Sequence, residues 1–154
     1  MQYQINLKIH PRFAQAVDCA ALRRVARAAL EQQRAPGPAA LTLAIADDRA
    51  LHQLNREFLG QDHPTDVLSF PEGDTDPDTG RRYLGDIVIS LPTARRQARA
   101  ARHALEAELQ LLVAHGVLHL LGHDHARPRE KARMWKAQDE ILAKLQSGHP
   151  LKRR

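Results

Sequence analysis

Cysteine, aromatic residues and long apolar runs are all scarce in this chain of 154 residues. The single cysteine, Cys19, excludes a disulfide framework within the chain, and a lone thiol in a helical stretch is typical of core filler rather than of a nucleophile. Three Phe, two Tyr and one Trp offer little material for a base-stacking surface. No apolar stretch reaches the roughly 18 to 20 residues of a membrane span, and the N-terminal residues lack the features of a secretory signal. These absences predict a cytoplasmic protein with no membrane partner.

Positive charge, by contrast, is in excess. The net charge is +5 and the isoelectric point is about 9.9. Basic residues gather in three clusters: Arg23, Arg24 and Arg27; Arg95, Arg96, Arg99 and Arg102; and Arg127, Arg129, Lys131, Arg133 and Lys136. This charge predicts a polyanionic partner such as nucleic acid. The alternative is that surface helices expose arginine only for solubility.

Three of the 9 histidines have the spacing of a metal site. His115 and His119 stand four residues apart in an apolar run that predicts a helix, so both rings are expected on one face, about 6 Å apart along the axis. Gly122 can adopt the left-handed conformation that ends a helix and returns His125 toward the same point. Three imidazoles leave a tetrahedral metal one open position, as in catalytic zinc sites. We therefore predict one Zn²⁺ per chain on His115, His119 and His125, with nickel as the alternative.

Two other interpretations of these histidines have to be weighed. A pair at helical spacing also occurs on ordinary surfaces and in cores. No charged residue lies between Leu109 and Leu121, however, which predicts a buried helix whose imidazoles need hydrogen bonds or a metal. The spacing also matches metzincin proteases, which carry a glutamate general base after the first histidine. Gly116 occupies that position here and argues against proteolysis by that mechanism.

Hydrophobic periodicity predicts a single α+β domain, with a four-stranded sheet packed with about five helices. Strands are expected at residues 2–9, 41–45, 67–70 and 83–90, and the acidic loop 72–80 indicates a hairpin-like connection between the last two. Helices are expected at about 13–33, 47–59, 92–101, 105–121 and 128–145. The fourth helix carries His115 and His119 and is expected to be buried in the centre. We assign residues 1–148 to this domain and 149–154 to a basic C-terminal tail.

Three sequence blocks resemble those of the YbeY family, bacterial zinc-dependent endoribonucleases linked to ribosomal RNA maturation. His115–His125 fits the family motif His-Gly-x-Leu-His-Leu-x-Gly-x-Asp-His at each fixed position. Pro64–Pro71 and Leu84–Ser90 are similar to the other two blocks, and their order and spacing agree. The similarity spans roughly Leu41 to Asp139.

One position departs from the family pattern. Family members usually carry an arginine shortly before the Pro-Thr-Asp block, in a segment Asn, Arg, x, aromatic, Arg. Here the segment Asn55–Leu59 places Leu59 at the second arginine. The resemblance implies that this residue faces the metal cleft and supports activity, so its absence predicts weaker catalysis. Arg56, one helical turn earlier, is the alternative source of the charge.

The resemblance implies a single-strand-type endoribonuclease acting in ribosomal RNA maturation and ribosome quality control. Its partners would be ribosomal RNA and the small ribosomal subunit. Zinc would lower the pKa of a water molecule or polarise a phosphoryl oxygen. Arginines around the cleft would hold the phosphate backbone, with Arg56, Arg95 and Arg99 as candidate RNA contacts.

Polar residues around the histidine motif leave several roles open. Asp124 either orients a ligating imidazole, the interpretation that we favour, or caps the turn after the helix. His123 is an alternate ligand, although its ring is expected to point away from that of His125. Asp66 and Asp86 lie in the family blocks, and we assign them no role. No general base is evident in the sequence.

Two other functions remain open from the sequence. The first is a zinc-stapled RNA-binding assembly factor that acts on the ribosome without cutting RNA, which the missing arginine and general base favour. A fourth protein ligand at the metal would identify it. The second is a small metallohydrolase of another substrate, for which a narrow, uncharged cleft would be the sign.

Overall fold

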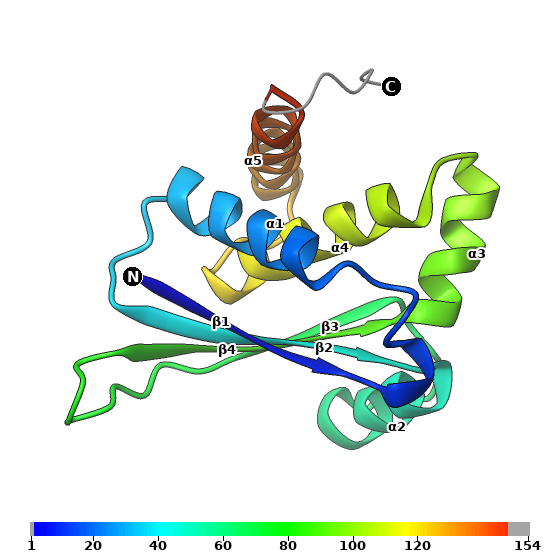
Figure 1. Ribbon diagram of the computed structural model, residues 1–154, viewed down its shortest axis with the longest axis horizontal. Helices are drawn as coiled ribbons and strands as arrows, with labels where there is room; N and C mark the ends of the chain where they lie inside the picture. Colours follow the sequence, from blue (N-terminus) through cyan, green and yellow to red (C-terminus); the bar gives the residue numbers. More distant parts are fainter. Residues whose placement is uncertain (1, 148–154) are drawn as a thin grey trace.

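The computed structural model describes residues 2–147 and is built around a mixed sheet of four strands (Figure 1). The strand order is β1-β2-β4-β3, in which β1, β2 and β4 are parallel and the edge strand β3 is antiparallel. The strands are β1 (Tyr3–Ile9), β2 (Ala39–Ala46), β3 (Val67–Pro71) and β4 (Arg82–Ser90). The helices are η1 (Pro11–Phe13), α1 (Cys19–Gln32), α2 (Asp48–Leu59), α3 (Leu91–Ala101), α4 (Leu105–Leu120) and α5 (Pro128–Ser147). The predicted single α+β domain with four strands and about five helices is confirmed.

Alternation along the strands divides the apolar residues between two cores. In β4, Ile87 and Ile89 join the main core, whereas Val88 joins a smaller one with Leu51 and Leu68. Side chains alternate across a strand, so successive residues point to opposite faces of the sheet. Helices α1 and α4 cover the first face, and α2 covers the second (Figure 1). The sheet is therefore buried on both faces near its centre.

Most helix boundaries follow the capping residues expected from the sequence. The carboxylate of Asp47 accepts a hydrogen bond from the Ala50 amide at the start of α2, and Gly60 ends that helix in the left-handed conformation with φ of 67°. The first predicted helix was wrong at its start. It begins at Cys19, because the Asp18 side chain caps it through the Ala21 amide, and a separate short 3-10 turn precedes it.

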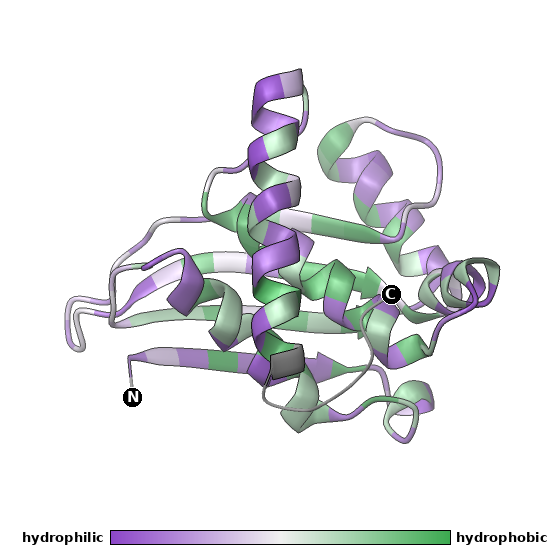
Figure 2. Cartoon of the chain, turned by 90° about the horizontal axis from the view of Figure 1, so that it is seen from above, coloured by the Kyte–Doolittle hydropathy of each residue, from purple (hydrophilic) through white to green (hydrophobic). Residues whose placement is uncertain are grey.

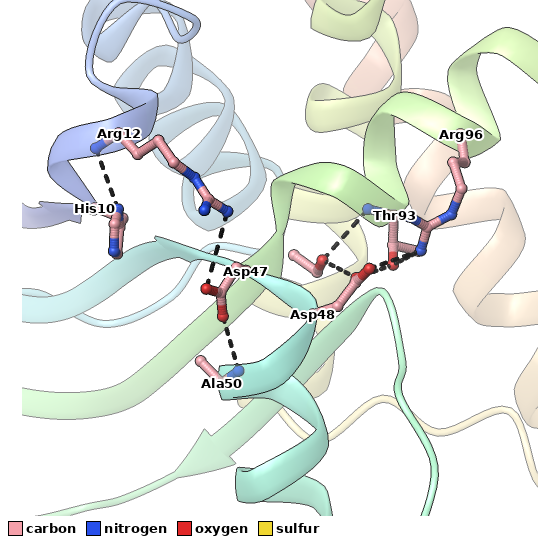
Figure 3. Close-up of polar contacts among 8 residues, drawn as sticks. His10, Arg12, Asp47, Asp48, Ala50, Thr93 and Arg96 are labelled. Carbon is pink, nitrogen blue, oxygen red and sulfur yellow. Dashed lines mark hydrogen bonds and ion pairs between the residues drawn. The ribbon is translucent and has the colours of Figure 1, made fainter.

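A polar cluster ties the start of α2 to the start of α3 (Figure 3). Asp48 accepts hydrogen bonds from Ser90, which caps α3, and from Thr93 and Arg96 in that helix. Burial raises the pKa of Asp48, but these hydrogen bonds outweigh it, so the net pKa lies below its ordinary value. The cluster fixes α2 relative to α3 at the carboxyl ends of the central strands β2 and β4.

Helix α4 is buried along most of its length, as predicted. It packs against β3, β4 and helices α1, α3 and α5, and both Leu112 and Leu118 are core residues. Gly116 lets it approach the sheet closely, because a Cβ there would lie 2.6 Å from Cγ2 of Ile87. On the same turn, the Ser69 hydroxyl of β3 donates a hydrogen bond of 3.2 Å to the Gly116 carbonyl. These two contacts hold α4 against the sheet at Gly116, the residue that follows His115.

Helix α5 projects from the α4 side of the molecule, and hydrophilic residues run along much of its length (Figures 1 and 2). Among residues 2–147, no helix has the length and apolarity that crossing a bilayer requires. The predicted tail, residues 149–154, lies outside the described residues, so the division at residue 148 remains a prediction.

Candidate metal centre and cleft

The three predicted histidines converge on one point. One ring nitrogen from each of His115, His119 and His125 lies within 4.8 Å of the others. The Nε2 atoms of His115 and His119 are 3.2 Å apart, and the ring centroids are separated by 4.7 to 5.7 Å. Within residues 2–147, no further His, Cys, Asp or Glu joins this group. Three nitrogen donors with an open side are the ligand set of catalytic zinc sites.

The local fold explains how residues ten positions apart meet. His115 and His119 share one face of α4, one turn apart. The chain then reverses at Gly122, whose φ of 97° favours glycine, and the His123 amide bonds back to the Leu118 carbonyl at 3.0 Å. This reversal returns His125 to the face of α4 that carries the other two rings.

Asp124 takes the second of its two predicted roles. Its carboxylate accepts hydrogen bonds from the backbone amides of His125 at 2.7 Å and Ala126 at 3.2 Å. These bonds stabilise the turn after α4, and among the described residues no bond joins Asp124 to a ring of the triad. The structure thus shows Asp124 capping the turn through one carboxylate oxygen, and its role in orienting an imidazole remains a prediction.

Gln138 of α5 orients an imidazole instead, and the sequence analysis missed it. Its Oε1 lies 3.3 Å from Nδ1 of His115, and its side chain is buried. An amide oxygen can only accept, so it selects the His115 tautomer with the proton on Nδ1 and the lone pair on Nε2. The available signal was a polar residue on the apolar face of α5, between the buried Ala137 and Ile141.

Two other polar residues near the motif belong elsewhere in the fold. His123 points toward α1, where its Nε2 lies 2.7 Å from Oε1 of Gln33, so it is outside the triad. Asp86 accepts a hydrogen bond from the Tyr83 hydroxyl, which also contacts Thr42. That network lies on the sheet face opposite α4, because Asp86 alternates with Ile87.

Burial keeps the inner histidines neutral. It lowers the pKa of His119 to about 4, and the charges of His115 and His125 act in the same direction. Burial also lowers the pKa of His115, against the opposing effect of the Gln138 hydrogen bond. Both rings are therefore unprotonated at pH 7, with a lone pair on the nitrogen that a metal would bind.

The triad lies in an open cleft of about 330 Å³ between α4, the edge strand β3 and the end of α2. The other lining residues are Leu59, Thr65, Asp66, Val67, Leu68, Ser69 and Pro71. Buried Asn55 holds the loop before β3 in place through a hydrogen bond of 2.9 Å to the His63 carbonyl. Leu59 is 52% exposed and lies in the cleft rather than in the core.

None of the three candidate RNA-binding arginines lines this cleft. Arg56 is exposed on α2. Arg95 lies on α3 with its guanidinium 5.8 Å from the centre of the Phe13 ring, and Arg99 is exposed on the same helix. Their proposed RNA contacts remain predictions, and any such contact would be outside the cleft itself.

Comparisons with known proteins agree with this geometry. Residues 8–146 match the model of a family described as endoribonuclease YbeY. Endoribonuclease YbeY of Roseiflexus sp. (strain RS-1) is 41% identical over 147 residues, which cover 92% of each chain. Endoribonuclease YbeY of Myxococcus xanthus is 51% identical over 118 residues, which cover 76% of this chain but only 40% of that protein. The solution structure of TM1509 from Thermotoga maritima aligns with a TM-score of 0.58 and 25% identity over 98% of this chain and 99% of that one. The chain therefore belongs to the endoribonuclease YbeY family.

Proposed function

We propose that this chain hydrolyses single-stranded RNA at one Zn²⁺ ion held by His115, His119 and His125. Its setting would be ribosomal RNA maturation and ribosome quality control in the cytoplasm, with the small ribosomal subunit as partner. The observation that carries the proposal is the convergence of three imidazoles at the wall of an open cleft. Membership of the endoribonuclease YbeY family supports RNA as the substrate.

The donor set fits zinc. Three nitrogen donors and no carboxylate in the group favour zinc over magnesium or calcium, which prefer oxygen ligands. The neutral state of His115 and His119 at pH 7 removes competition from protons. Zinc bound there would act as a Lewis acid toward a phosphodiester and lower the pKa of water.

The chain's own residues hold and shape this site. Gln138 keeps the His115 ring in the orientation and tautomer that present Nε2 to the metal. Asp66 lines the cleft, and one of its oxygens already accepts a hydrogen bond of 2.8 Å from the Val67 amide. Its negative charge raises the pKa of His115, in opposition to burial, so it also favours positive charge in the cleft.

Positive charge outside the cleft supports an extended RNA path. The net charge of +5 and the exposed basic residues of α5 provide phosphate contacts that lie beyond the metal ligands. Because such contacts release counterions, RNA binding should weaken steeply as salt rises. The cleft is open and runs beside the edge strand β3, so it can accommodate an extended single strand of RNA, which a deep pocket would exclude.

The decisive experiment compares two histidine variants. His119→Ala removes one member of the triad, whereas His123→Ala removes an imidazole of the same motif that bonds to Gln33. We expect His119→Ala to lose bound zinc, measured by elemental analysis, and to lose RNA cleavage by at least about 100-fold, since second-shell changes alone reach that scale. His123→Ala should keep both. Full cleavage by His119→Ala protein would refute the metal-dependent mechanism.

The same assay distinguishes the proposed nuclease from the non-catalytic alternative. Leu59 occupies the cleft position at which the family resemblance predicts an arginine, and this apolar replacement favours an assembly factor that binds RNA without cutting it. Native protein that contains zinc and binds RNA, but leaves it intact, would establish that alternative instead.

A further inference from the structure

Large apolar side chains are exposed at few places in residues 2–147, and these places lie in the histidine cleft or next to residues that contact it. The exposed fractions are 64% for Phe58, 52% for Leu59 and 41% for Trp135. Leu59 lines the cleft, and Phe58 beside it packs edge-on against Phe70 of β3, with ring centroids 5.7 Å apart. The Trp135 ring lies beside the imidazole of His115, at a centroid distance of 6.2 Å and a tilt of 38°.

The backbone that carries Trp135 is fixed to the core. Met134, Ala137 and Ile141 on α5 are buried in the main core, whereas Trp135 lies outside it. Trp135 and Gln138 are three residues apart and therefore share a side of the helix. Gln138 bonds to His115, so this side of α5 faces the triad. The indole is thus held next to the site on a rigid helix, yet it contributes little to the buried core.

The surroundings of the indole suit a nucleotide. Exposed basic residues precede and follow it on α5 and at its start: Arg127, Arg129, Lys131, Arg133 and Lys136. Guanidinium and ammonium groups attract phosphates, and an exposed indole offers a flat π face on which an unpaired base can stack. Bases within a duplex already stack on one another, so a platform of this kind selects single strands.

We propose that Trp135 is a base-stacking residue that holds a nucleotide next to the scissile phosphate, and that it gives the cleft its preference for single-stranded RNA. The proposal rests on RNA being the substrate of the site. It also corrects the expectation from composition, because one well-placed aromatic residue supplies a stacking platform in a chain with few of them. A base that stacks beside His115 places its flanking phosphate at the triad.

Trp135 is the only tryptophan in the chain, so its fluorescence reports on this position alone. The native protein with its metal is titrated with a short single-stranded oligoadenylate, and separately with inorganic polyphosphate. We expect the oligoadenylate to quench the emission at saturation and polyphosphate to leave it unchanged. Equal quenching by polyphosphate, or no change with oligoadenylate, would overturn the proposal.

Three variants test the contribution of the aromatic face to cleavage. Trp135→Ala should raise KM for single-stranded RNA by roughly 5- to 150-fold, the range that corresponds to the loss of one base–aromatic stack. Trp135→Phe should retain most of the affinity, whereas Trp135→Leu, which keeps an apolar side chain without a π face, should resemble the alanine variant. Zinc content should be unchanged in all three. A native KM for Trp135→Leu would overturn the proposal.

The two proposals fail in different ways. Native protein that cleaves RNA without any change in Trp135 emission would retain the proposed function and refute the stacking role. Quenching by oligoadenylate in a native protein that never cleaves RNA would support the stacking role and refute the nuclease function.

Discussion

The two ends of α4 use histidine in opposite ways. At its start, Nε2 of His103 lies 2.6 Å from Oε1 of Glu108, and both side chains are buried at 7% and 6% exposure. At its end, His115 and His119 meet His125 with no carboxylate in the group. A carboxylate engages a ring nitrogen of His103, whereas the triad turns its nitrogens toward one another. Buried histidines thus differ here in their partners, because a carboxylate occupies a nitrogen of His103 whereas the triad leaves its nitrogens free of carboxylates, as a zinc site would need.

Leu118 lies between His115 and His119 in the sequence, and its side chain is fully buried in the core. Leu118→Ala should lower the free energy of unfolding by about 2 to 5 kcal/mol, because a fully buried leucine leaves a cavity when it is truncated. Urea denaturation would measure this loss. Leu59→Ala is the matched control, since that leucine is 52% exposed, and its midpoint should hardly move. Equal midpoints for native and Leu118→Ala protein would contradict the buried position of α4.

Removal of the Glu108 carboxylate at the start of α4 should lower the free energy of unfolding without affecting zinc binding. Glu108→Ala leaves the buried His103 ring without its partner, and we expect a loss of about 1 to 3 kcal/mol in the free energy of unfolding. Glu106→Ala changes an exposed glutamate in the same first turn and serves as control. Zinc content should be native in both. Loss of zinc from the Glu108→Ala protein would contradict a purely structural role for the His103–Glu108 pair.

In the metal-free protein, acidification should lower the free energy of unfolding through the histidines at the end of α4. The folded-state pKa of His119 is about 4, below its ordinary value of 6.5, so the unfolded chain binds a proton first as pH falls. Stability should therefore be intact above about pH 6.5 and decline between about 6.5 and 4, by at most about 1.4 kcal/mol per pH unit for this one group.

Chelator-treated protein and its His119→Gln variant, unfolded in urea at several pH values, would measure that contribution. The variant should show a shallower pH dependence than the native protein, because glutamine does not titrate. Parallel curves for the two proteins would show that His119 does not differ in pKa between the folded and unfolded states.

The smallest expected effect concerns the apolar wall of the cleft. Leu59→Arg should raise RNA cleavage roughly two- to five-fold, the equivalent of a partly exposed ion pair of about 0.4 to 1 kcal/mol with a phosphate. The fold should tolerate the change, because Leu59 is half exposed. Leu59→Gln, which is polar but uncharged, is the control in a steady-state assay. Unchanged cleavage by well-folded Leu59→Arg protein would mean that the departure from the family pattern has no functional effect.

The parts of the molecule that the sequence predicted well are those that depend on neighbours along the chain. The burial of α4 follows from an apolar run without charges, and the meeting of His115, His119 and His125 follows from helical spacing and Gly122. The start of α1 was misjudged, because the apolar residues before Asp18 continue the helical pattern although the chain caps at that residue.

The partners of the triad could not be predicted, because they come from another helix. Gln138 and Trp135 reach His115 only after α5 folds back over α4, and no spacing in the sequence encodes that approach. For Asp124 the sequence left two roles open, and the structure shows the cap of the turn. A carboxylate beside ligands suggests a role in orienting them, yet the nearest unsatisfied donors are the amides of its own turn.

The contact between Gly116 and Ile87 has a consequence for how this protein can change over evolutionary time. One added methyl group at position 116 would meet Ile87 at 2.6 Å and displace the helix that carries His115 and His119. A substitution at this core contact would therefore also change the positions of the triad histidines. Leu59 and Trp135, by contrast, stand on exposed helix surfaces next to the same site. Those two positions can therefore change without displacing the three histidines.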